Sequence, residues 1–313
     1  MTVAFVFPGQ GSQAVGMGRD LAEAFPAARH VFEEVDDALD QKLSKVMFEG
    51  PEETLVLTEN AQPALMAVSM AVMRVLAEEG DITLADKAAF VAGHSLGEYS
   101  ALAAASAISL GDAARLLKLR GQSMQKAVPV GVGAMAAIIG PELDAVRNIA
   151  TEAAAGDVCD VGNDNAPGQV VLSGDKAAVE RAVKIAADQG VRRSIMLPVS
   201  APFHCALMKP AADAMEKALA DIELQAPVVP VVANVTAEAV RDPAIIRELL
   251  VRQVTEMVRW RECVLYMKDQ GVDTLLELGA GKVLGGLTRR IDREMTGRSV
   301  QGPDDIEELL KSL

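Results

Sequence analysis

Three residues in the first third of the chain have the spacing of a nucleophilic turn. Gly93, Ser95 and Gly97 follow an apolar run at residues 88–92 and precede a helix-forming stretch at residues 98–107. This order indicates a strand, then a turn so tight that it needs glycines on both sides, then a helix. Such a turn lifts the serine hydroxyl above the sheet, and the first N–H groups of the helix face the atom that the serine attacks. The pattern predicts a nucleophilic Ser95; the alternative is a serine that only caps the helix.

A nucleophilic serine needs a base, and the chain has three histidines. His30 lies in an amphipathic stretch that predicts a surface helix. His94 directly precedes Ser95, and because neighbouring side chains diverge in an extended turn, it is poorly placed to reach the hydroxyl. His204 stands in a proline-stiffened loop, residues 198–204, where the chain can face a cleft. We therefore expect His204 to be the base; the alternative is a histidine bonded to backbone.

Arg120 is unusual because it lies on an apolar helix face. In a helix predicted over residues 112–126, it shares that face with Leu117 and Met124. A guanidinium turned inward requires an anion, since an unpaired buried charge is costly. From the sequence two partners remain open: a structural salt bridge with a carboxylate such as Glu98, or a substrate carboxylate held bidentately.

The glycine-containing loop at residues 8–13 follows a predicted strand and fits the Gly-x-Gly-x-x-Ala form of a dinucleotide-binding turn. The residues after it do not fit that class. They are helical in pattern, and no second strand ends in an acidic residue at the required distance. We expect the loop instead to supply a backbone N–H to an oxyanion hole, beside the N–H of Leu96.

The order of the predicted elements indicates one α/β body with a smaller one inserted. Residues 3–7 predict a buried strand, and residues 63–79 predict an apolar helix with Pro63 in its first turn. Strands at residues 228–232 and 274–278 alternate with helices near the end of the chain. Between these parts lie a strand at 134–139, a helix at 141–155, strands at 158–161 and 169–172, a helix at 176–189 and a strand at 193–197.

This inserted order, β-α-β-β-α-β, is the ferredoxin-like split unit. We therefore expect an α/β protein with an α/β-hydrolase-like large subdomain, residues 1–129 and 200–313, and an inserted ferredoxin-like small subdomain, residues 130–199. A cleft between the two subdomains is the expected place for the chemistry.

Composition narrows the class of protein further. The net charge of −14 argues against nucleic acid and anionic membranes as partners. The apolar run at residues 61–76 is too short for a membrane span and contains Arg74. The three cysteines are scattered without metal-ligand spacing, which suits reduced thiols, and the N-terminus lacks the basic region of a signal peptide. We expect a cytoplasmic protein.

Together these motifs resemble the malonyl-CoA:acyl carrier protein transacylases, in the freestanding form found in bacterial fatty acid synthesis. The similarity covers nearly the whole chain in the same order. The matching segments are residues 7–13, Gln62-Pro63-Ala64, residues 93–99, Arg120-Gly121, Ala201-Pro202-Phe203-His204 and Gly281-Lys282-Val283-Leu284.

The resemblance implies a malonyl ester on Ser95, with His204 as general acid and base and Arg120 as the ligand of the malonyl carboxylate. It implies that the backbone N–H groups of Gln10 and Leu96 bind the oxyanion. It also implies a position near the active site for Gln62, no metal or bound cofactor, and malonyl-CoA and an acyl carrier protein as partners.

Further details follow from the same resemblance. The backbone carbonyl of Gln253, rather than a carboxylate, is expected to orient His204. Phe203 matches the malonyl-selective form of its loop, in which methylmalonyl-selective relatives usually have serine. Met257 and Ala280 stand where many members have proline, and we expect these two departures to affect only the local backbone.

Two other classes share part of the pattern: a serine hydrolase and a non-enzymatic module that binds acyl thioesters. The inward arginine and the lack of an obvious carboxylate partner for His204 count against the hydrolase.

The acyl carrier proteins that the resemblance implies as partners are small and acidic, so a net charge of −14 opposes their approach unless a local basic patch reverses it. The candidate residues for that patch are Arg192, Arg193, Lys282, Arg289 and Arg290.

Overall fold

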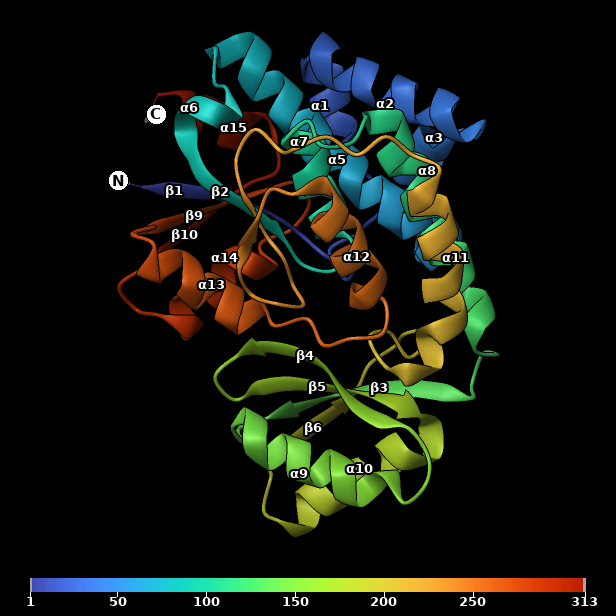
Figure 1. Ribbon diagram of the computed structural model, residues 1–313. Helices are drawn as coiled ribbons and strands as arrows, with labels where there is room; N and C mark the ends of the chain where they lie inside the picture. Colours follow the sequence, from blue (N-terminus) through green and yellow to red (C-terminus); the bar gives the residue numbers. More distant parts are fainter. Residues whose placement is uncertain (1, 312–313) are drawn as a thin grey trace.

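The computed structural model describes residues 2–311, which form two β-sheets with their helices (Figure 1). Up to residue 129 the elements are β1 (Val3–Phe7), α1 (Arg19–Ala24), α2 (Pro26–Leu39), α3 (Leu43–Glu49), α4 (Glu52–Leu55), α5 (Thr58–Gly80), α6 (Leu84–Lys87), β2 (Ala88–Gly93), α7 (Gly97–Ala104) and α8 (Leu110–Ala127). The next are β3 (Gly133–Ile139), α9 (Leu143–Ala154), β4 (Cys159–Ala166), β5 (Gln169–Asp175), α10 (Lys176–Asp188) and β6 (Arg193–Met196). The remainder are a 3-10 turn, η1 (Ala206–Met208), α11 (Lys209–Ala220), β7 (Val231–Val232), β8 (Ala239–Val240), α12 (Pro243–Gln253), α13 (Trp260–Asp269), β9 (Thr274–Leu278), α14 (Val283–Ile291), β10 (Thr296–Val300) and α15 (Pro303–Leu310).

The larger sheet is buried on both faces. Its strand order is β10-β9-β1-β2-β7-β8, and only the β7–β8 pair is antiparallel. Along β1, Phe5 and Phe7 point into a core shared with α5 and α8, whereas Ala4 and Val6 point into a second core shared with α13 and α14. A continuous apolar run such as β1 is typical of a parallel strand covered by helices on both sides.

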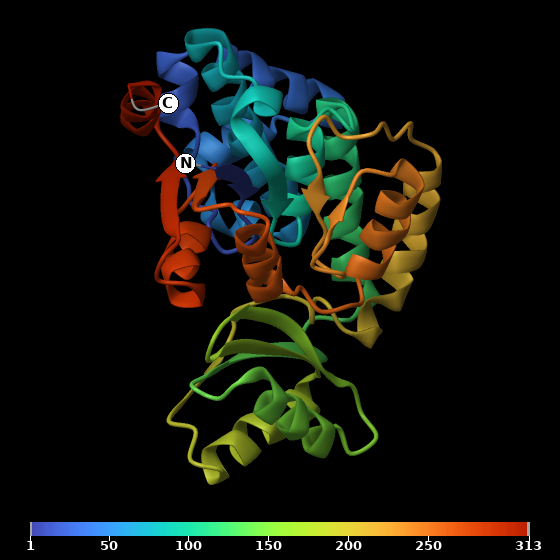
Figure 2. The same cartoon turned by 60° about the vertical axis from the view of Figure 1, so that its left-hand side comes forward.

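Three loops leave the larger sheet side by side. Phe7 pairs with Gly93 in parallel register, and Ala92 pairs with Val232. The loops that follow β1, β2 and β7 therefore emerge at the same carboxyl edge, where parallel α/β sheets place their ligands. This edge faces the smaller sheet (Figures 1 and 2).

The smaller sheet has the predicted ferredoxin-like arrangement. Its order is β4-β5-β3-β6, every pair is antiparallel, and its elements lie within residues 133–196. Helices α9 and α10 cover the face that points away from the larger sheet (Figure 2). The predicted fold class, an α/β body with a separate antiparallel small subdomain, is confirmed.

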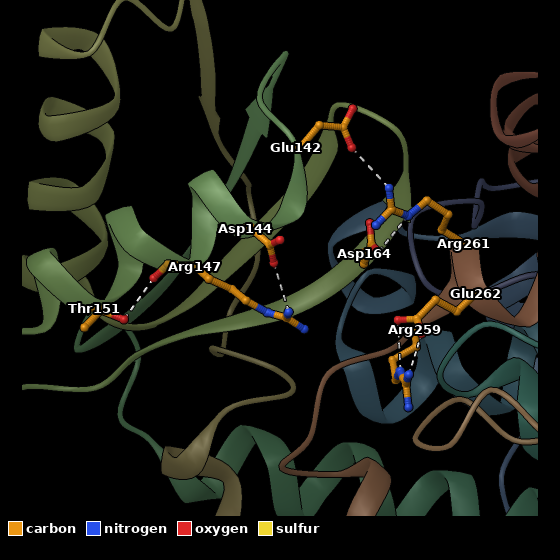
Figure 3. Close-up of polar contacts among 8 residues, drawn as sticks. All are labelled: Glu142, Asp144, Arg147, Thr151, Asp164, Arg259, Arg261 and Glu262. Carbon is orange, nitrogen blue, oxygen red and sulfur yellow. Dashed lines mark hydrogen bonds and ion pairs between the residues drawn. The ribbon is translucent and has the colours of Figure 1, made fainter.

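Polar contacts fasten the small subdomain to α13 of the large one (Figure 3). Arg261 on α13 reaches Asp164 of β4 with an N–O distance of 2.9 Å and Glu142 at the start of α9 with 3.2 Å. The Asp164 carboxylate is fully buried, so this pair lies inside the joint. Backbone bonds join the same segments, because Val258 donates to the Gly162 carbonyl and accepts from the Asp164 N–H.

Three details differ from the sequence-based expectations. Helix α5 begins at Thr58, so Pro63 lies inside the helix and not in its first turn; backbone bonds from Asn60 and Ala61 to the Leu57 carbonyl start the helix earlier. Strand β4 continues beyond residue 161 to Ala166, because it stays paired with β5 as far as Ala166 opposite Gln169. Asn163 also pairs with Val258. Strand β7 is shorter than expected, and β8 and β10 were not predicted.

Within residues 2–311, no helix combines the length and the apolar character that crossing a membrane requires.

Candidate active site

Ser95 occupies a sharp turn between β2 and α7. Its backbone has φ of +55°, in the left-handed region that non-glycine residues adopt only where the surroundings enforce it. A Cβ on Gly93 would lie 1.9 Å from the backbone of Gly97, and a Cβ on Gly97 would lie 2.3 Å from the Phe7 carbonyl oxygen. The two flanking glycines are therefore required by close backbone contact, as the sequence pattern predicted.

His204 lies against the Ser95 hydroxyl. The Ser95 Oγ to His204 Nε2 distance is 2.8 Å, and Nδ1 lies 2.8 Å from the backbone carbonyl oxygen of Gln253. Because a carbonyl only accepts hydrogen bonds, Nδ1 carries the proton and Nε2 is left to accept from the serine. Burial, followed by the positive charge of Arg120, lowers the pKa of His204 to about 3, so the imidazole is neutral at pH 7.

Arg120 extends from α8 to the same hydroxyl and is 1% exposed. Its Nη2 donates to Ser95 Oγ at 3.1 Å and to Gln253 Oε1 at 2.9 Å, while Nη1 donates to Gln62 Oε1 at 2.8 Å. The guanidinium also lies 5.7 Å from the centre of the Tyr99 ring. Among residues 2–311, no carboxylate forms an ion pair with Arg120, and its Nε–H has no acceptor.

A chain of polar side chains links Arg120 to the loop after β1. Gln62 Nε2 donates to Thr58 Oγ1 at 3.0 Å, and Thr58 Oγ1 donates to Gln10 Oε1 at 2.9 Å. In the described part of the chain, neither the Gln10 N–H nor the Leu96 N–H has a hydrogen-bond acceptor. Both residues line the cavity beside Ser95, which leaves two N–H groups available to an oxyanion.

The cavity beside Ser95 has a volume of about 430 Å³. Polar groups form one end of it, and its walls are apolar side chains from both subdomains. The apolar lining residues are Leu96, Met124, Met135, Val171, Leu197, Pro198, Val199 and Phe203. A pocket of this size with few converging polar groups is suited to a small acyl chain.

A larger and more open groove of about 920 Å³ lies on the other side of His204, but it does not include Ser95 or Arg120. Its cations already have carboxylate partners: Arg147 pairs with Asp144, and Arg259 pairs with Glu262 (Figure 3). Ser95 and the Arg120 cation both line the smaller cavity, which makes it the candidate site for an acyl group.

Residues 4–292 match the model of the acyl transferase domain. The chain belongs to the acyl transferase domain family. The large match, together with the serine, histidine and arginine in one cavity, makes this protein an acyltransferase.

Named relatives cover almost the whole chain. The malonyl CoA-acyl carrier protein transacylase of Escherichia coli strain K12 is 47% identical over 98% of this chain and 98% of its own length. That of Bacillus subtilis strain 168 is 44% identical over 99% of this chain and 97% of its own length.

Solved structures agree closely with the fold of this acyltransferase. The acyl-carrier-protein S-malonyltransferase of Bartonella henselae is 54% identical and superposes with a TM-score of 0.97, over 100% of this chain and 99% of that one. A malonyl-transacylase solved in complex with a type II PKS acyl-carrier protein is 45% identical, with a TM-score of 0.96 over 100% of both chains.

The structure brings the residues singled out in the sequence to one place. Those that line the 430 Å³ cavity are Gln10, Gln62, Ser95, Leu96, Arg120, Phe203 and His204. Gln253 lies behind them and contacts His204 through its carbonyl. His94 also borders the cavity, but its Nε2 is bonded to Asn165 Oδ1 at 2.8 Å, and His30 is exposed on α2.

One alternative left open by the sequence is wrong, and two departures from the family lie away from the cavity. Arg120 does not form a salt bridge with Glu98; the Gln253 amide separates them. Met257 lines the larger groove and packs against the core of the small subdomain, and Ala280 is buried near the loop after β9.

Sequence reasoning missed three contributions to this site. Asn234 Oδ1 accepts from the Ser95 N–H at 2.8 Å, and the Gln253 side chain contacts Arg120 in addition to its carbonyl contact with His204. Thr58 holds Gln62. One signal pointed to Asn234: it is a polar residue directly after an apolar strand, and such residues gather at the carboxyl edge of a parallel sheet.

Proposed function

We propose that this acyltransferase transfers a malonyl group from malonyl-CoA to the phosphopantetheine thiol of an acyl carrier protein, through a malonyl ester on Ser95, and so supplies fatty acid chain elongation. The observation that carries the proposal is the buried Arg120 guanidinium, 3.1 Å from Ser95 Oγ and without a carboxylate partner among residues 2–311. An acyl group that ends in a carboxylate supplies the missing anion at the nucleophile. The names of the two bacterial relatives support the same substrates.

In the first half-reaction, Ser95 Oγ attacks the thioester carbonyl while its proton moves to His204 Nε2. The N–H groups of Gln10 and Leu96 stabilise the oxyanion of the tetrahedral intermediate. When the intermediate collapses, the carbon–sulfur bond breaks, and the coenzyme A thiolate takes the proton from Nε2. The product is the malonyl ester of Ser95, and His204 is neutral again.

Arg120 affects this step in two ways. It binds the malonyl carboxylate, which aligns the thioester carbonyl with Ser95 Oγ. Its positive charge also lowers the pKa of the His204 imidazole. A carboxylate bound at the guanidinium offsets that charge, so His204 becomes a stronger base once a malonyl group is in place.

The second half-reaction reverses the first with a different thiol. The phosphopantetheine thiol of the carrier protein loses its proton to His204 Nε2 and attacks the ester carbonyl, and the same N–H groups bind the oxyanion. The carbon–oxygen bond to Ser95 then breaks, and the serine recovers its proton from the imidazole. Two substrates that use one cavity in turn give ping-pong kinetics.

We place this reaction in the cytoplasm. The thiols of Cys159, Cys205 and Cys263 are all free, which suits a reducing compartment.

The decisive experiment is intact-mass spectrometry after brief exposure to malonyl-CoA. We expect a mass increase of one malonyl group on Ser95, lost when a thiol-bearing carrier protein is added. Assays of free malonate, run with and without carrier protein, separate transfer from hydrolysis. Absence of any adduct would leave only a binding role, and rapid release of malonate without carrier protein would make the protein a hydrolase.

A further inference from the structure

Glu98 is a buried acid directly behind the nucleophile turn. It follows Gly97 in the first turn of α7, and it is 2% exposed. Its Oε2 accepts from two donors, Gln253 Nε2 at 2.9 Å and the backbone N–H of Asn234 at 3.0 Å. Neither bond involves a group to which the proposed mechanism assigns a covalent or proton-transfer step, so Glu98 has no role yet.

The Gln253 amide connects this acid to Arg120. Its Oε1 accepts from Arg120 Nη2 at 2.9 Å, while its Nε2 faces Glu98 Oε2 and, at 3.0 Å, the carbonyl oxygen of Ser95. The reversed amide would place an oxygen against these two acceptors and an NH₂ group against a guanidinium, which only donates. The amide orientation is therefore set by the acceptors on one side and the cation on the other.

Asn234 extends the same contact to the turn itself. Its Oδ1 accepts from the Ser95 N–H at 2.8 Å, and its Nδ2 donates to the Gly93 carbonyl at 2.7 Å. One side chain thus bridges the two ends of a strained turn, and its own backbone N–H is held by Glu98. The acid therefore contacts both the residue that braces Ser95 and the residue that holds Arg120.

We propose that Glu98 is a positioning residue for acyl selectivity, which acts through the Gln253 amide to hold Arg120 beside Ser95 and leave the guanidinium open to a substrate carboxylate. The amide links the acid to Arg120 without a direct salt bridge, which would occupy the guanidinium. The inference rests on the proposed malonyl transfer. It concerns which acyl group is preferred and adds no step to the reaction.

The test compares malonyl with acetyl transfer, because only the malonyl group needs Arg120. Glu98→Ala leaves a buried Gln253 N–H without its acceptor, and leaving such a donor unpaired is worth roughly a ten- to hundredfold change. We expect the malonyl-to-acetyl ratio of kcat/KM to fall by about that factor. Glu98→Gln keeps an oxygen acceptor and is expected to restore most of the ratio.

Two further variants show whether Glu98 acts through Arg120. In an Arg120→Ala background, adding Glu98→Ala should leave the ratio unchanged, since the effect has already been removed. Gln253→Ala keeps the backbone carbonyl that faces His204 but removes the bridge, so it should lower the ratio as Glu98→Ala does. It also decides the question if Glu98→Ala does not fold.

Ser100→Ala is the matched control. Ser100 lies on the same helix, is equally buried, and its Oγ has no hydrogen-bond partner among residues 2–311, so the ratio should not change. Equal losses of malonyl and acetyl transfer in Glu98→Ala would mean that Glu98 stabilises the buried core and does not affect acyl selectivity. An unchanged ratio in Gln253→Ala, or no recovery in Glu98→Gln, would also overturn the proposal. A wild-type protein that forms no malonyl adduct would instead refute the function itself.

Discussion

The guanidinium of Arg120 and the hydroxyl of Ser95 share a hydrogen bond of 3.1 Å in the interior of the protein. Within residues 2–311, the hydrogen bonds of the Arg120 guanidinium go to uncharged side chains: Ser95, Gln62 and Gln253. Desolvation lowers the pKa of Arg120, and an arginine nevertheless stays protonated in a protein. A permanent cation therefore lies beside the proposed nucleophile, and the proposed malonyl carboxylate would supply its anion.

Replacing Arg120 by alanine is expected to change acyl preference as well as rate. Malonyl transfer should fall steeply, because the substrate carboxylate would enter a buried site without its cation. Acetyl and short acyl thioesters no longer face an unpaired buried cation, so their relative use should rise. The measurement is the ratio of malonyl to acetyl transfer in the two proteins.

Arg115→Ala is the control for that experiment. Arg115 lies on the same helix, α8, and forms an ion pair with Asp112 at the surface, so its loss should leave the ratio as in the wild type. A ratio that also stayed constant in Arg120→Ala would make Arg120 a purely structural residue.

His204 is expected to be needed for both half-reactions. His204→Ala should slow malonyl transfer by roughly two to four orders of magnitude, the usual contribution of a positioned acid and base. Ser95→Ala should abolish the malonyl adduct. His30→Ala, on the exposed face of α2, is the control and should remain active. Near-full activity without His204 would assign the base elsewhere.

The nucleophile turn was predictable because its requirements are local. Gly93 and Gly97 are needed where backbone atoms nearly touch, and this need is visible as glycines at fixed spacing around Ser95. The order of elements in the small subdomain was predictable for a similar reason, since each strand and helix has its own apolar periodicity.

The supporting contacts could not be predicted from one sequence. Asn234 lies 139 residues from Ser95 in the chain, and Gln253 lies 155 residues from Glu98, so no local pattern joins either pair. The start of α5 was missed because Pro63 predicted a first turn, whereas long-range bonds of Thr58 and Gln62 hold an earlier one. Packing between distant segments decided these features.

Phe203 is expected to limit the space around the α-carbon of the acyl group. It is 8% exposed and forms part of the wall of the 430 Å³ cavity. Phe203→Ser should raise methylmalonyl transfer relative to malonyl transfer. The change should be modest, because one methyl group in a pocket changes discrimination by about 1–3 kcal/mol. Competition between the two thioesters measures the ratio directly. If methylmalonyl use did not rise, other wall residues would set the size limit.

The Glu98 carboxyl should make the free energy of unfolding fall as pH rises, the opposite of the usual effect of a carboxyl group. Burial raises the pKa of its carboxyl to about 7 from an ordinary 4.5, although the Asn234 and Gln253 donors and the Arg120 charge oppose the shift. Between these values the folded state binds the proton more tightly than the unfolded state does. This group therefore lowers the free energy of unfolding as pH rises from about 4.5 to 7.

Glu98→Gln isolates that effect. Desolvation also raises the pKa values of Tyr99 and Cys263, the other titratable groups that interact with Glu98, so both stay neutral in this window and Arg120 is the remaining charge. His204 has a lowered pKa and contributes the opposite slope, but equally in both proteins. Denaturant unfolding at several pH values should show the variant gaining stability relative to the wild type as pH rises. A constant difference from pH 5 to 8 would contradict the assignment.

The last prediction concerns how an acidic carrier protein approaches a chain with a net charge of −14. All five candidate basic residues are exposed. Arg290 on α14 donates to Gln169 at the start of β5 at 2.8 Å, and Gln169 and Arg193 both pair with Ile139 from opposite sides of β3. Strands lie about 4.8 Å apart, so the Cα atoms of residues 169 and 193 are separated by about 10 Å. Arg193 and Arg290 therefore belong to one region where the two subdomains meet.

Charge reversal in this region should act on one half-reaction only. We expect Arg193→Glu combined with Arg290→Glu to raise the Michaelis constant for carrier protein, while malonylation of Ser95 by malonyl-CoA stays close to the wild-type rate. Added salt should likewise slow the second half-reaction more than the first, because it screens long-range attraction. Lys184→Glu, at an exposed position on α10, removes a charge of the same sign and should leave both halves unchanged. Helix α10 covers the face of the small sheet that points away from the larger sheet (Figure 2). If reversal at Arg193 and Arg290 slowed both halves equally, these side chains would be binding the phosphates of coenzyme A or stabilising the fold, and the docking surface would have to be sought at Arg192, Lys282 and Arg289.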